Sequence, residues 1–278
     1  MLKTRADVVK ALEYAKAQGI SADLSGWNLA YRDLSGLHLD NVILTGANLR
    51  GANLCGCTLK HISAEGADLE NANLTGAFVS EVNLIHANLK RALLTEASIS
   101  RSNLAHASLY GAYLNKTILY DTNLTGTDLS RLSILESSLM NIDLSGANLS
   151  RSSIRKSNLE GVDLSGANLS ESFIRKSNLE GVNLSGAILL SGCFDSSKLI
   201  DINFKNAYLK EASFYNSQLN NIDLSGACLF KANLGVYALN NINFQGADLS
   251  QANFTRVSGF NQVQFKQALL LGAAPSVI

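Results

Sequence analysis

Two histidines stand at equivalent places in a repeating pattern, and paired imidazoles can bind a metal or titrate together. His86 and His106 are twenty residues apart, which would stack them about 4.8 Å from each other if twenty residues make one coil of β-structure. Two imidazoles with no acidic or thiol ligand beside them make a poor zinc site. We therefore interpret both histidines as turn residues and expect no metal site.

Thiol chemistry needs cysteines that converge, and here they are spread along the chain. Cys55 and Cys57 are close in sequence, whereas Cys193 and Cys228 follow far downstream. Such spacing builds neither a four-thiolate metal site nor the disulfide framework of a short secreted chain. We expect Cys57 to point inward as a small packing residue and Cys55 to face outward.

The rest of the chain shows little that could perform catalysis. Strings such as Asn-Leu-Ser resemble glycosylation acceptors but recur as by-products of a repeat, and no Lys-Ser/Thr follows the spaced glycines. Catalysis needs groups that converge in a concave pocket, which a repeat with its large side chains inside does not offer. The sequence predicts a protein that is not an enzyme and needs no cofactor.

Net charge and hydropathy indicate which partners and which cellular location to expect for the protein. The formal net charge is +0, whereas general nucleic-acid binders carry a basic excess. The N-terminal stretch lacks the apolar run of a signal peptide, and no segment approaches the ~20 apolar residues of a membrane span. We expect a soluble, cytoplasmic protein in a reducing compartment, without direct contact to nucleic acid or membrane.

A strict five-residue period determines the fold class. Every fifth residue from Leu24 to Phe254 is Leu, Ile, Phe or Val, with Ala64 as the exception. Five residues advance an α-helix by roughly 500°, and an odd step sends successive side chains of a strand to opposite faces. These residues can all point inward only if the chain turns a corner after every five residues.

A second period of twenty residues indicates that four corners close one coil. Residues 151–170 and 171–190 are near copies of each other, and alanine usually occupies a second inward position two residues before the central leucine. Glycines from Gly26 onward recur at steps of twenty and suit the positive-φ position of a type II turn. The sequence therefore predicts an all-β solenoid, a quadrilateral parallel β-helix of about 12 coils.

Both ends of this solenoid carry candidate caps. Thr4 and Asp7 fit the start of a helix that Gly19 ends. One face of that helix is apolar and can cover the first coil, through Val8, Ala11, Leu12 and Ala15. We expect a short N-terminal capping helix, the β-helix and a C-terminal cap or tail, at residues 1–20, 21–258 and 259–278.

The strings LTGANLRGANL, ADLENANLTGA and GADLSQANF resemble the pentapeptide-repeat family, whose consensus is A(D/N)LXX. The resemblance covers about residues 21–258 without interruption. It implies a right-handed quadrilateral β-helix without catalytic residues. Members of the family include topoisomerase-protecting proteins that mimic duplex DNA, regulators that act through protein contacts, and secreted effectors.

Outward positions hold two kinds of candidate partner-binding residues. Apolar side chains typical of interfaces should gather at one corner and the adjoining face, at Leu93, Tyr110, Tyr113, Ile118, Tyr120 and Met140. Charges divide between opposite sides of the solenoid. The basic side concentrates in Arg131, Arg151, Arg155, Lys156, Arg175 and Lys176, and the acidic side includes Asp143, Asp163 and Asp223.

These surfaces favour a rigid protein-binding scaffold or regulator, with a protein partner of unknown identity. The alternative is a DNA mimic that occupies the duplex-binding groove of a topoisomerase such as DNA gyrase. The acidic faces favour the mimic. Against it, duplex DNA carries one charge per ~1.7 Å, several times the density of these faces.

The C-terminal end is unusually apolar, and a solenoid end presents unpaired strand edges. The residues that leave the regular core there are Phe260, Phe265, Leu269, Leu270 and Leu271. We predict a homodimer through this end, closed by twofold symmetry. The alternative is a tail that folds back as a simple cap.

Overall fold

A computed structural model describes the chain at residues 2–236, 238–255, 270 and 271. The chain folds as a β-solenoid of about 11 turns with parallel strands and one short helix at its N-terminus, which confirms the fold class expected from the repeat. The repeat had indicated about twelve coils. Within the described residues, no helix is long and apolar enough to cross a membrane.

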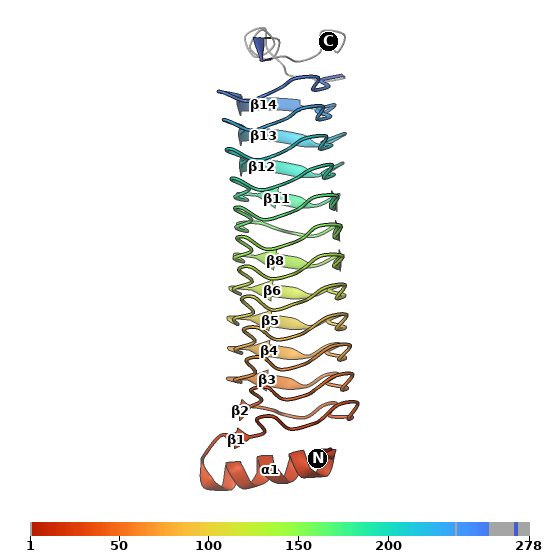
Figure 1. Cartoon of the computed structure of the whole chain (residues 1–278), viewed down its shortest axis with the longest axis vertical. Helices are drawn as coiled ribbons and strands as arrows, with labels where there is room; N and C mark the ends of the chain where they lie inside the picture. The colour runs from red at the N-terminus through yellow and green to blue at the C-terminus, as the bar shows by residue number, and fades with distance from the viewer. Residues whose placement is uncertain (1, 237, 256–269, 272–278) are drawn as a thin grey trace. The chain divides into compact units, whose positions relative to one another are not determined.

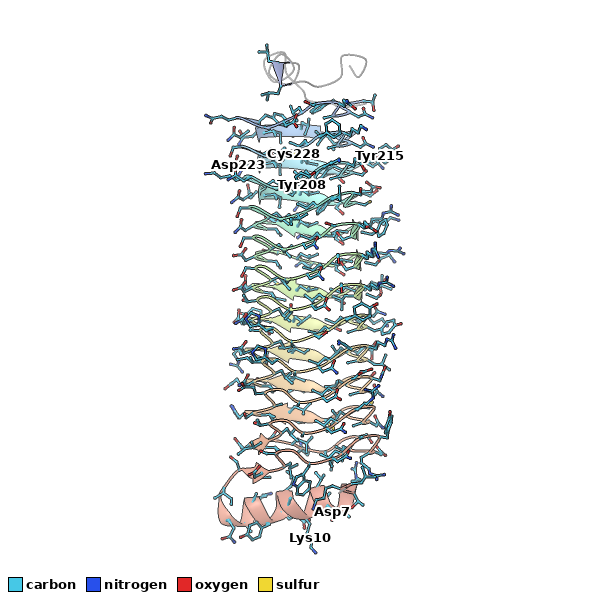
Figure 2. All side chains as sticks on the ribbon, viewed as in Figure 1. Asp7, Lys10, Tyr208, Tyr215, Asp223 and Cys228 are labelled. Atoms are coloured by element: carbon cyan, nitrogen blue, oxygen red, sulfur yellow. The ribbon has the colours of Figure 1, made fainter. Side chains whose placement is uncertain are left out.

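The chain divides into two compact units, Met1–Ser138 and Leu139–Ile278. The first unit opens with helix α1 (Arg5–Gln18), and Thr4 and Asp7 form the predicted capping box at its start. Gly19 ends the helix in the left-handed conformation, with φ 66°. Val8 and Ala15 are buried and Ala11 and Leu12 half-buried, so the predicted apolar face is confirmed. Figure 2 labels Asp7 and Lys10 on this helix.

Short parallel strands on successive coils build the first unit. Strands β3 to β6 form one sheet in sequence order, and their Cα partners are twenty residues apart, as in Thr58↔Phe78. Figure 1 shows these strands stacked one above another. The strands are β1 (Ala22–Asp23), β2 (Val42–Ile43), β3 (Thr58–Lys60), β4 (Phe78–Ser80), β5 (Ser98–Ser100), β6 (Ile118–Tyr120) and β7 (Ser133–Leu135), and β8 (Ser138–Met140) spans the division between the units.

The second unit repeats this arrangement. Strands β9 and β10 pair in parallel, and β11 to β14 form a second parallel sheet, again with partners twenty residues apart. The strands are β9 (Ser153–Arg155), β10 (Phe173–Arg175), β11 (Asn178–Glu180), β12 (Lys198–Asn203), β13 (Gln218–Asp223) and β14 (Ala238–Asn243). The twenty-residue coil predicted from the sequence is therefore confirmed in each unit.

Many corners are turns closed by a hydrogen bond between residues three apart. In the first unit the Ala47 N–H donates to the Leu44 carbonyl at 2.9 Å, and in the second the Ala147 N–H donates to Leu144 at 3.0 Å. The third residue of such a turn has positive φ, and this holds for every fifth residue from Gly26 to Gln251 except Val236. The glycine column is thus confirmed, together with its non-glycine members His86, His106 and Asn206.

Positive φ extends beyond that column to all four corners of a coil. Arg91, Glu96 and Lys116 take φ values of 55°, 59° and 54°. Val236 departs because a β-branched side chain is a genuine outlier at positive φ. There the Val236 N–H donates to the Leu234 carbonyl at 2.7 Å, and the side chain is buried.

The core consists of the two inward residues of each five. Leucine or another large apolar residue fills one position and usually alanine the other, and both are buried from coil to coil. Aromatic rings replace leucine late in the second unit, where Phe194 and Phe214 stack at a centroid distance of 5.2 Å and Phe204 lies edge-on to both.

A buried serine ladder runs along one inward column of the second unit. The N–H groups of Ser157, Ser177 and Ser197 donate to the hydroxyl one coil later, at 3.3, 3.3 and 3.1 Å. The hydroxyls donate onward to backbone carbonyls, as Ser217 does to Phe194 at 2.7 Å. These hydroxyl groups therefore join neighbouring coils. They do so at an inward position that is usually alanine elsewhere in the repeat.

Candidate functional site

Four of the predicted interface residues come together on the first unit, and we call this set the apolar corner: Leu93, Tyr113, Ile118 and Tyr120. Leu93 and Tyr113 are bridge partners on adjacent coils. Ile118 and Tyr120 belong to β6, just beyond the corner at Asn115–Lys116. Their exposed fractions are 40%, 47%, 54% and 44%, so each large apolar side chain meets solvent.

Two further predicted residues do not share this environment. Tyr110 is half-buried at the preceding corner, where the Arg131 guanidinium lies 6.0 Å from the centre of its ring. Met140 is half-buried and belongs to the second unit. The apolar set predicted from the sequence is therefore brought together only in part.

The sequence analysis missed several exposed apolar residues of the first unit, among them Phe78 and Leu135 on its strands. Phe78 is 41% exposed and Leu135 36%. Phe78 belongs to the sheet of Ile118, because Ser98 pairs with both. A large apolar residue at an outward position was the available signal in both cases.

The basic candidates fall into different environments. Arg151 is paired, since its Nε lies 3.0 Å from Glu171 Oε2. Arg131 belongs to the first unit, beside Tyr110. The other four form two stacks on one corner of the second unit, and we call them the basic corner: Arg155, Lys156, Arg175 and Lys176. Arg155 and Arg175 are direct Cα partners in the β9–β10 pair, and Lys156 and Lys176 follow them in the turn.

The acidic candidates lie in one column of the second unit. Asp143 and Asp163 are bridge partners on adjacent coils. Each carboxylate accepts the N–H of the serine two residues on, at 2.9 Å in Asp143, 2.8 Å in Asp163 and 2.9 Å in Asp223. Figure 2 shows Asp223 and Tyr215 on opposite sides of the unit. Tyr215 shares its column with Arg155 and Arg175, so acidic and basic columns lie on opposite sides of this unit.

Side-chain amides donate hydrogen bonds to the carboxylates of the acidic column. Partial burial works to raise the pKa of the Asp223 carboxyl, but hydrogen bonds from Ser225 and Asn243 and the charge of Lys205 lower it below its usual value. Asn183 donates to Asp163 at 3.1 Å and Asn243 to Asp223 at 2.9 Å. Asparagine occupies three of the six positions of this stack from Asp143 to Asn243, which lowers the density of its negative charge.

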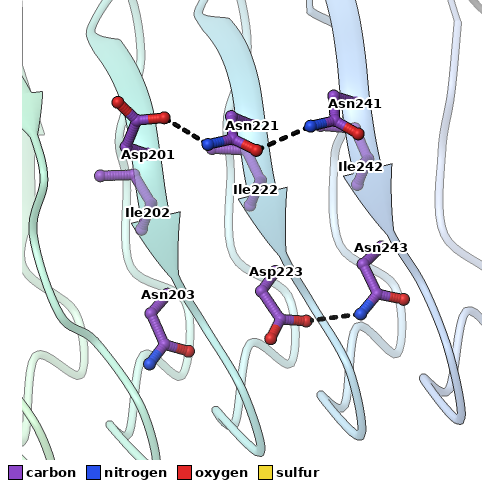
Figure 3. A pocket seen from close by; sticks show the side chains of 9 residues that line it. All are labelled: Asp201, Ile202, Asn203, Asn221, Ile222, Asp223, Asn241, Ile242 and Asn243. Carbon is purple, nitrogen blue, oxygen red and sulfur yellow. Dashed lines mark hydrogen bonds between the residues drawn. The ribbon is translucent and has the colours of Figure 1, made fainter.

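Asn203, Asp223 and Asn243 of this column border a shallow groove of about 580 Å³ on the second unit (Figure 3). Asn221 donates to Asp201, and Asn241 donates to Asn221 at 2.7 Å, so a ladder of polar side chains links three coils. Ile202, Ile222 and Ile242 lie buried beside it. The ladder was not predicted from the sequence, although asparagine at steps of twenty was a visible signal.

The histidines and cysteines behave as turn and packing residues. The rings of His86 and His106 stack with centroids 5.5 Å apart, both at positive φ. Cys57 is buried, as predicted, and its thiol donates to the Leu34 carbonyl at 3.0 Å. Burial raises the pKa of this thiol. In the described part of the chain, no group of three or more His, Cys, Asp or Glu could hold a metal ion.

Of the residues predicted for dimerisation, Phe260, Phe265 and Leu269 lie outside the described residues. Leu270 is 88% exposed. Leu271 accepts at its carbonyl the N–H of Leu249 at 3.1 Å.

The corners, the two inward columns and the twenty-residue register define a class of protein, the parallel β-solenoids built from five-residue repeats. A family model described as pentapeptide repeats matches eight copies, within residues 22–60, 65–101, 92–131, 136–170, 157–199, 197–235 and 238–272. The chain belongs to the pentapeptide-repeat family. None of the curated proteins matches the sequence.

Solved structures of the same family are similar to this chain. HetL, a pentapeptide repeat protein involved in heterocyst differentiation regulation from the cyanobacterium Nostoc, is 28% identical, with 87% of this chain and 94% of that chain covered and a TM-score of 0.30. QnrB1, a plasmid-mediated fluoroquinolone resistance protein, is 14% identical, with 92% and 97% covered and a TM-score of 0.38. Rfr23 from the cyanobacterium Cyanothece is 28% identical, with 41% and 85% covered and a TM-score of 0.20.

Proposed function

We propose that this protein is a non-enzymatic, rigid scaffold that binds a partner protein. The observation that carries the proposal is the apolar corner of the first unit, where Leu93, Tyr113, Ile118 and Tyr120 are each at least 40% exposed. A few residues near the centre of an interface supply most of its binding energy, and tyrosine is enriched among them. If a partner protein covers the apolar corner, these side chains would form the centre of the interface.

The backbone beneath the apolar corner supports the same function. Leu94 N–H donates to the Tyr113 carbonyl at 2.8 Å, and Tyr113 N–H donates to Ala92 at 3.1 Å. Ile118 pairs with Ser98 of the preceding coil in the parallel strands β5 and β6. A surface held by such bonds loses little conformational freedom on binding, so more of the contact energy remains as affinity.

The alternative function, a DNA mimic for DNA gyrase or another topoisomerase, is favoured by the stacked carboxylates of Asp143 and Asp163. Two features of the same column make the scaffold the better-supported function. Asn183 and Asn203 separate Asp163 from Asp223 in this column. Asn183 donates a hydrogen bond to Asp163, and Asn243 donates one to Asp223. Duplex DNA instead presents an unbroken charge every ~1.7 Å.

A comparison of surface variants tests the scaffold. The full chain is used to capture proteins from its native host, and the same is done with Tyr113→Ser combined with Ile118→Ser. We expect the variant to lose at least about tenfold of the captured partner, since two buried interface anchors commonly cost more than 1.4 kcal/mol together. The thermal midpoints of both proteins should agree, because both side chains point outward.

A matched control is available on the second unit, where Ile188 and Tyr208 are bridge partners exposed by 44% and 42%. Ile188→Ser combined with Tyr208→Ser removes a similar apolar pair. The proposal expects this variant to retain the partner. Equal loss in both variants, or no loss in either, would contradict a role of the apolar corner.

A further inference from the structure

The basic corner of the second unit stacks like charges on adjacent coils. Arg155 and Arg175 are direct partners in a parallel strand pair, which places their Cα atoms about 4.8 Å apart. Lys156 and Lys176 follow these arginines directly in the turn, so they also lie one above the other on the two coils. Like charges directly opposite one another destabilise a sheet. Neighbouring positive charges repel one another, and an anion that binds between them reduces this repulsion.

The near copies 151–170 and 171–190 show that this stacking is not a general result of repetition. Where Arg151 would face a second arginine, the later copy has Glu171, and the two side chains form an ion pair at 3.0 Å. Where Asp163 would face a second aspartate, the later copy has Asn183, which donates to it at 3.1 Å. The basic corner keeps identical residues in both copies.

The other retained stack of like charge, Glu160 over Glu180, has a counter-ion. Lys198 Nζ lies 2.9 Å from Glu180 Oε2. At the basic corner, in contrast, the side chains of Arg155 and Lys176 make no hydrogen bond or ion pair with the residues that the structure describes. Their N–H donors are exposed to solvent.

Arg175 is held in a fixed orientation beside these free donors. Its guanidinium lies 5.2 Å from the centre of the Phe173 ring. Its Nε donates to Cys193 Sγ at 3.2 Å, and its terminal nitrogen lies 3.7 Å from Asp195. A planar guanidinium fixed in this way offers its remaining donors outward without further loss of side-chain freedom.

We propose that the basic corner binds a phosphate group carried by a side chain of the partner protein. A phosphorylated side chain brings close to two negative charges and three acceptor oxygens, so one group can accept hydrogen bonds from Arg155 and Arg175 together. The inference rests on the proposed scaffold function, because it assigns the chemistry of one segment of that partner.

The surroundings favour a single phosphate over a long polyanion. Glu171 precedes the basic corner, and Glu160 and Glu180 follow it on the same two coils. These carboxylates would repel a nucleic-acid backbone that continues past the corner in either direction. The cations lie on two adjacent coils, about 4.8 Å apart, so they match one phosphate group and not a long chain of phosphates.

Fluorescence anisotropy with a short labelled peptide of glycine and serine tests the proposal on the full chain. The probes are the peptide with one phosphoserine, the same peptide unphosphorylated, and a single-stranded DNA of matched label. We expect the phosphopeptide to bind at least about tenfold more tightly than the unphosphorylated one. Arg155→Ser combined with Arg175→Ser should abolish this preference.

Lys205→Ser combined with Lys231→Ser is the matched control, since it removes two positive charges elsewhere on the same unit and should keep the preference. Equal binding of both peptides, or equal loss in both variants, overturns the proposal. Tighter binding of the DNA than of the phosphopeptide also overturns it, in favour of a nucleic-acid site.

The outcome can be separated from that of the scaffold proposal. If the apolar corner fails to retain a partner while the phosphopeptide preference holds, only the scaffold is wrong. If a partner is captured through the apolar corner and phosphatase treatment of that partner changes nothing, only the phosphate site is wrong.

Discussion

The N–H of Ser197 donates to the hydroxyl of Ser217, one coil later, at 3.1 Å, and both residues are buried. That hydroxyl donates in turn to the Phe194 carbonyl at 2.7 Å. One side chain thus satisfies two buried backbone groups. In the neighbouring inward column, the Ser172 hydroxyl is equally buried and finds no partner among the described residues.

This difference predicts opposite effects of one substitution. Ser217→Ala leaves the Ser197 N–H and the Phe194 carbonyl without their partner, and a lost partner in the interior costs about 1–3 kcal/mol. Ser172→Ala removes only an unsatisfied hydroxyl, so we expect no loss or a small gain. Denaturant unfolding of both variants against the parent protein measures the effect. A similar loss in the two variants would mean that the ladder contributes nothing.

The lowered pKa of Asp223 predicts an acid-dependent contribution to stability. Its pKa in the folded chain is below the value of about 3.9 for an unfolded aspartate. The stabilisation is therefore complete above about pH 4 and disappears as the pH falls through the lower folded pKa. Asp223→Asn should flatten the fall of the thermal midpoint between neutral pH and pH 2.

Asn243→Ala provides the matched comparison, because it removes one donor to Asp223 and keeps the carboxyl. Its acid dependence should lie between those of the parent and of Asp223→Asn. An unchanged acid dependence in Asp223→Asn would show that other carboxyl groups account for it.

The scaffold function predicts that the chain does not protect DNA gyrase from a quinolone at micromolar concentration. A supercoiling assay with purified enzyme measures this. The DNA-mimic alternative predicts a different result for variants. Asp143→Asn, Asp163→Asn and Asp223→Asn together should then abolish protection, whereas serine in place of Arg155, Lys156, Arg175 and Lys176 should not. That pattern would replace the scaffold by the mimic.

We also expect a homodimer through the C-terminal end. Leu270 is 88% exposed, and burial of such a side chain contributes about 1.5–3 kcal/mol. Light scattering at tens of micromolar should find a dimer for the full chain and a monomer for a chain that ends at Ser258. A monomeric full chain would show that the tail acts as a simple cap.

Periodicity alone predicted which side chains lie inside, because a five-residue step admits one inward arrangement. It also predicted the positive φ of His86 and His106. Arg91 and Glu96 take the same conformation at other corners, so position in the repeat determines it more than residue type does. The serine ladder could not be predicted in this way. Serine and alanine fit the same inward position, and the hydroxyl of Ser217 has a partner while that of Ser172 has none.

The candidate surfaces were predicted as residue types and columns, and the structure adds their pairing. Register places Arg155 directly beside Arg175, so the basic corner follows from the twenty-residue period. Whether a charge is free depends on side-chain conformation, as in the contact of Arg175 with Cys193 and Asp195. Such contacts join residues eighteen or twenty apart through flexible side chains, which the repeat does not specify.

Backbone bonds between coils join residues about twenty apart, as from the Leu24 N–H to the Ile43 carbonyl and from Gly146 to Ser165. Relative contact order in a chain of 278 residues is then only about 0.07, a value typical of helical bundles. Each added coil closes a loop of the same modest length, however long the chain becomes. A protein made of strands should therefore fold at a speed set by one coil, far faster than a β-sandwich of its size.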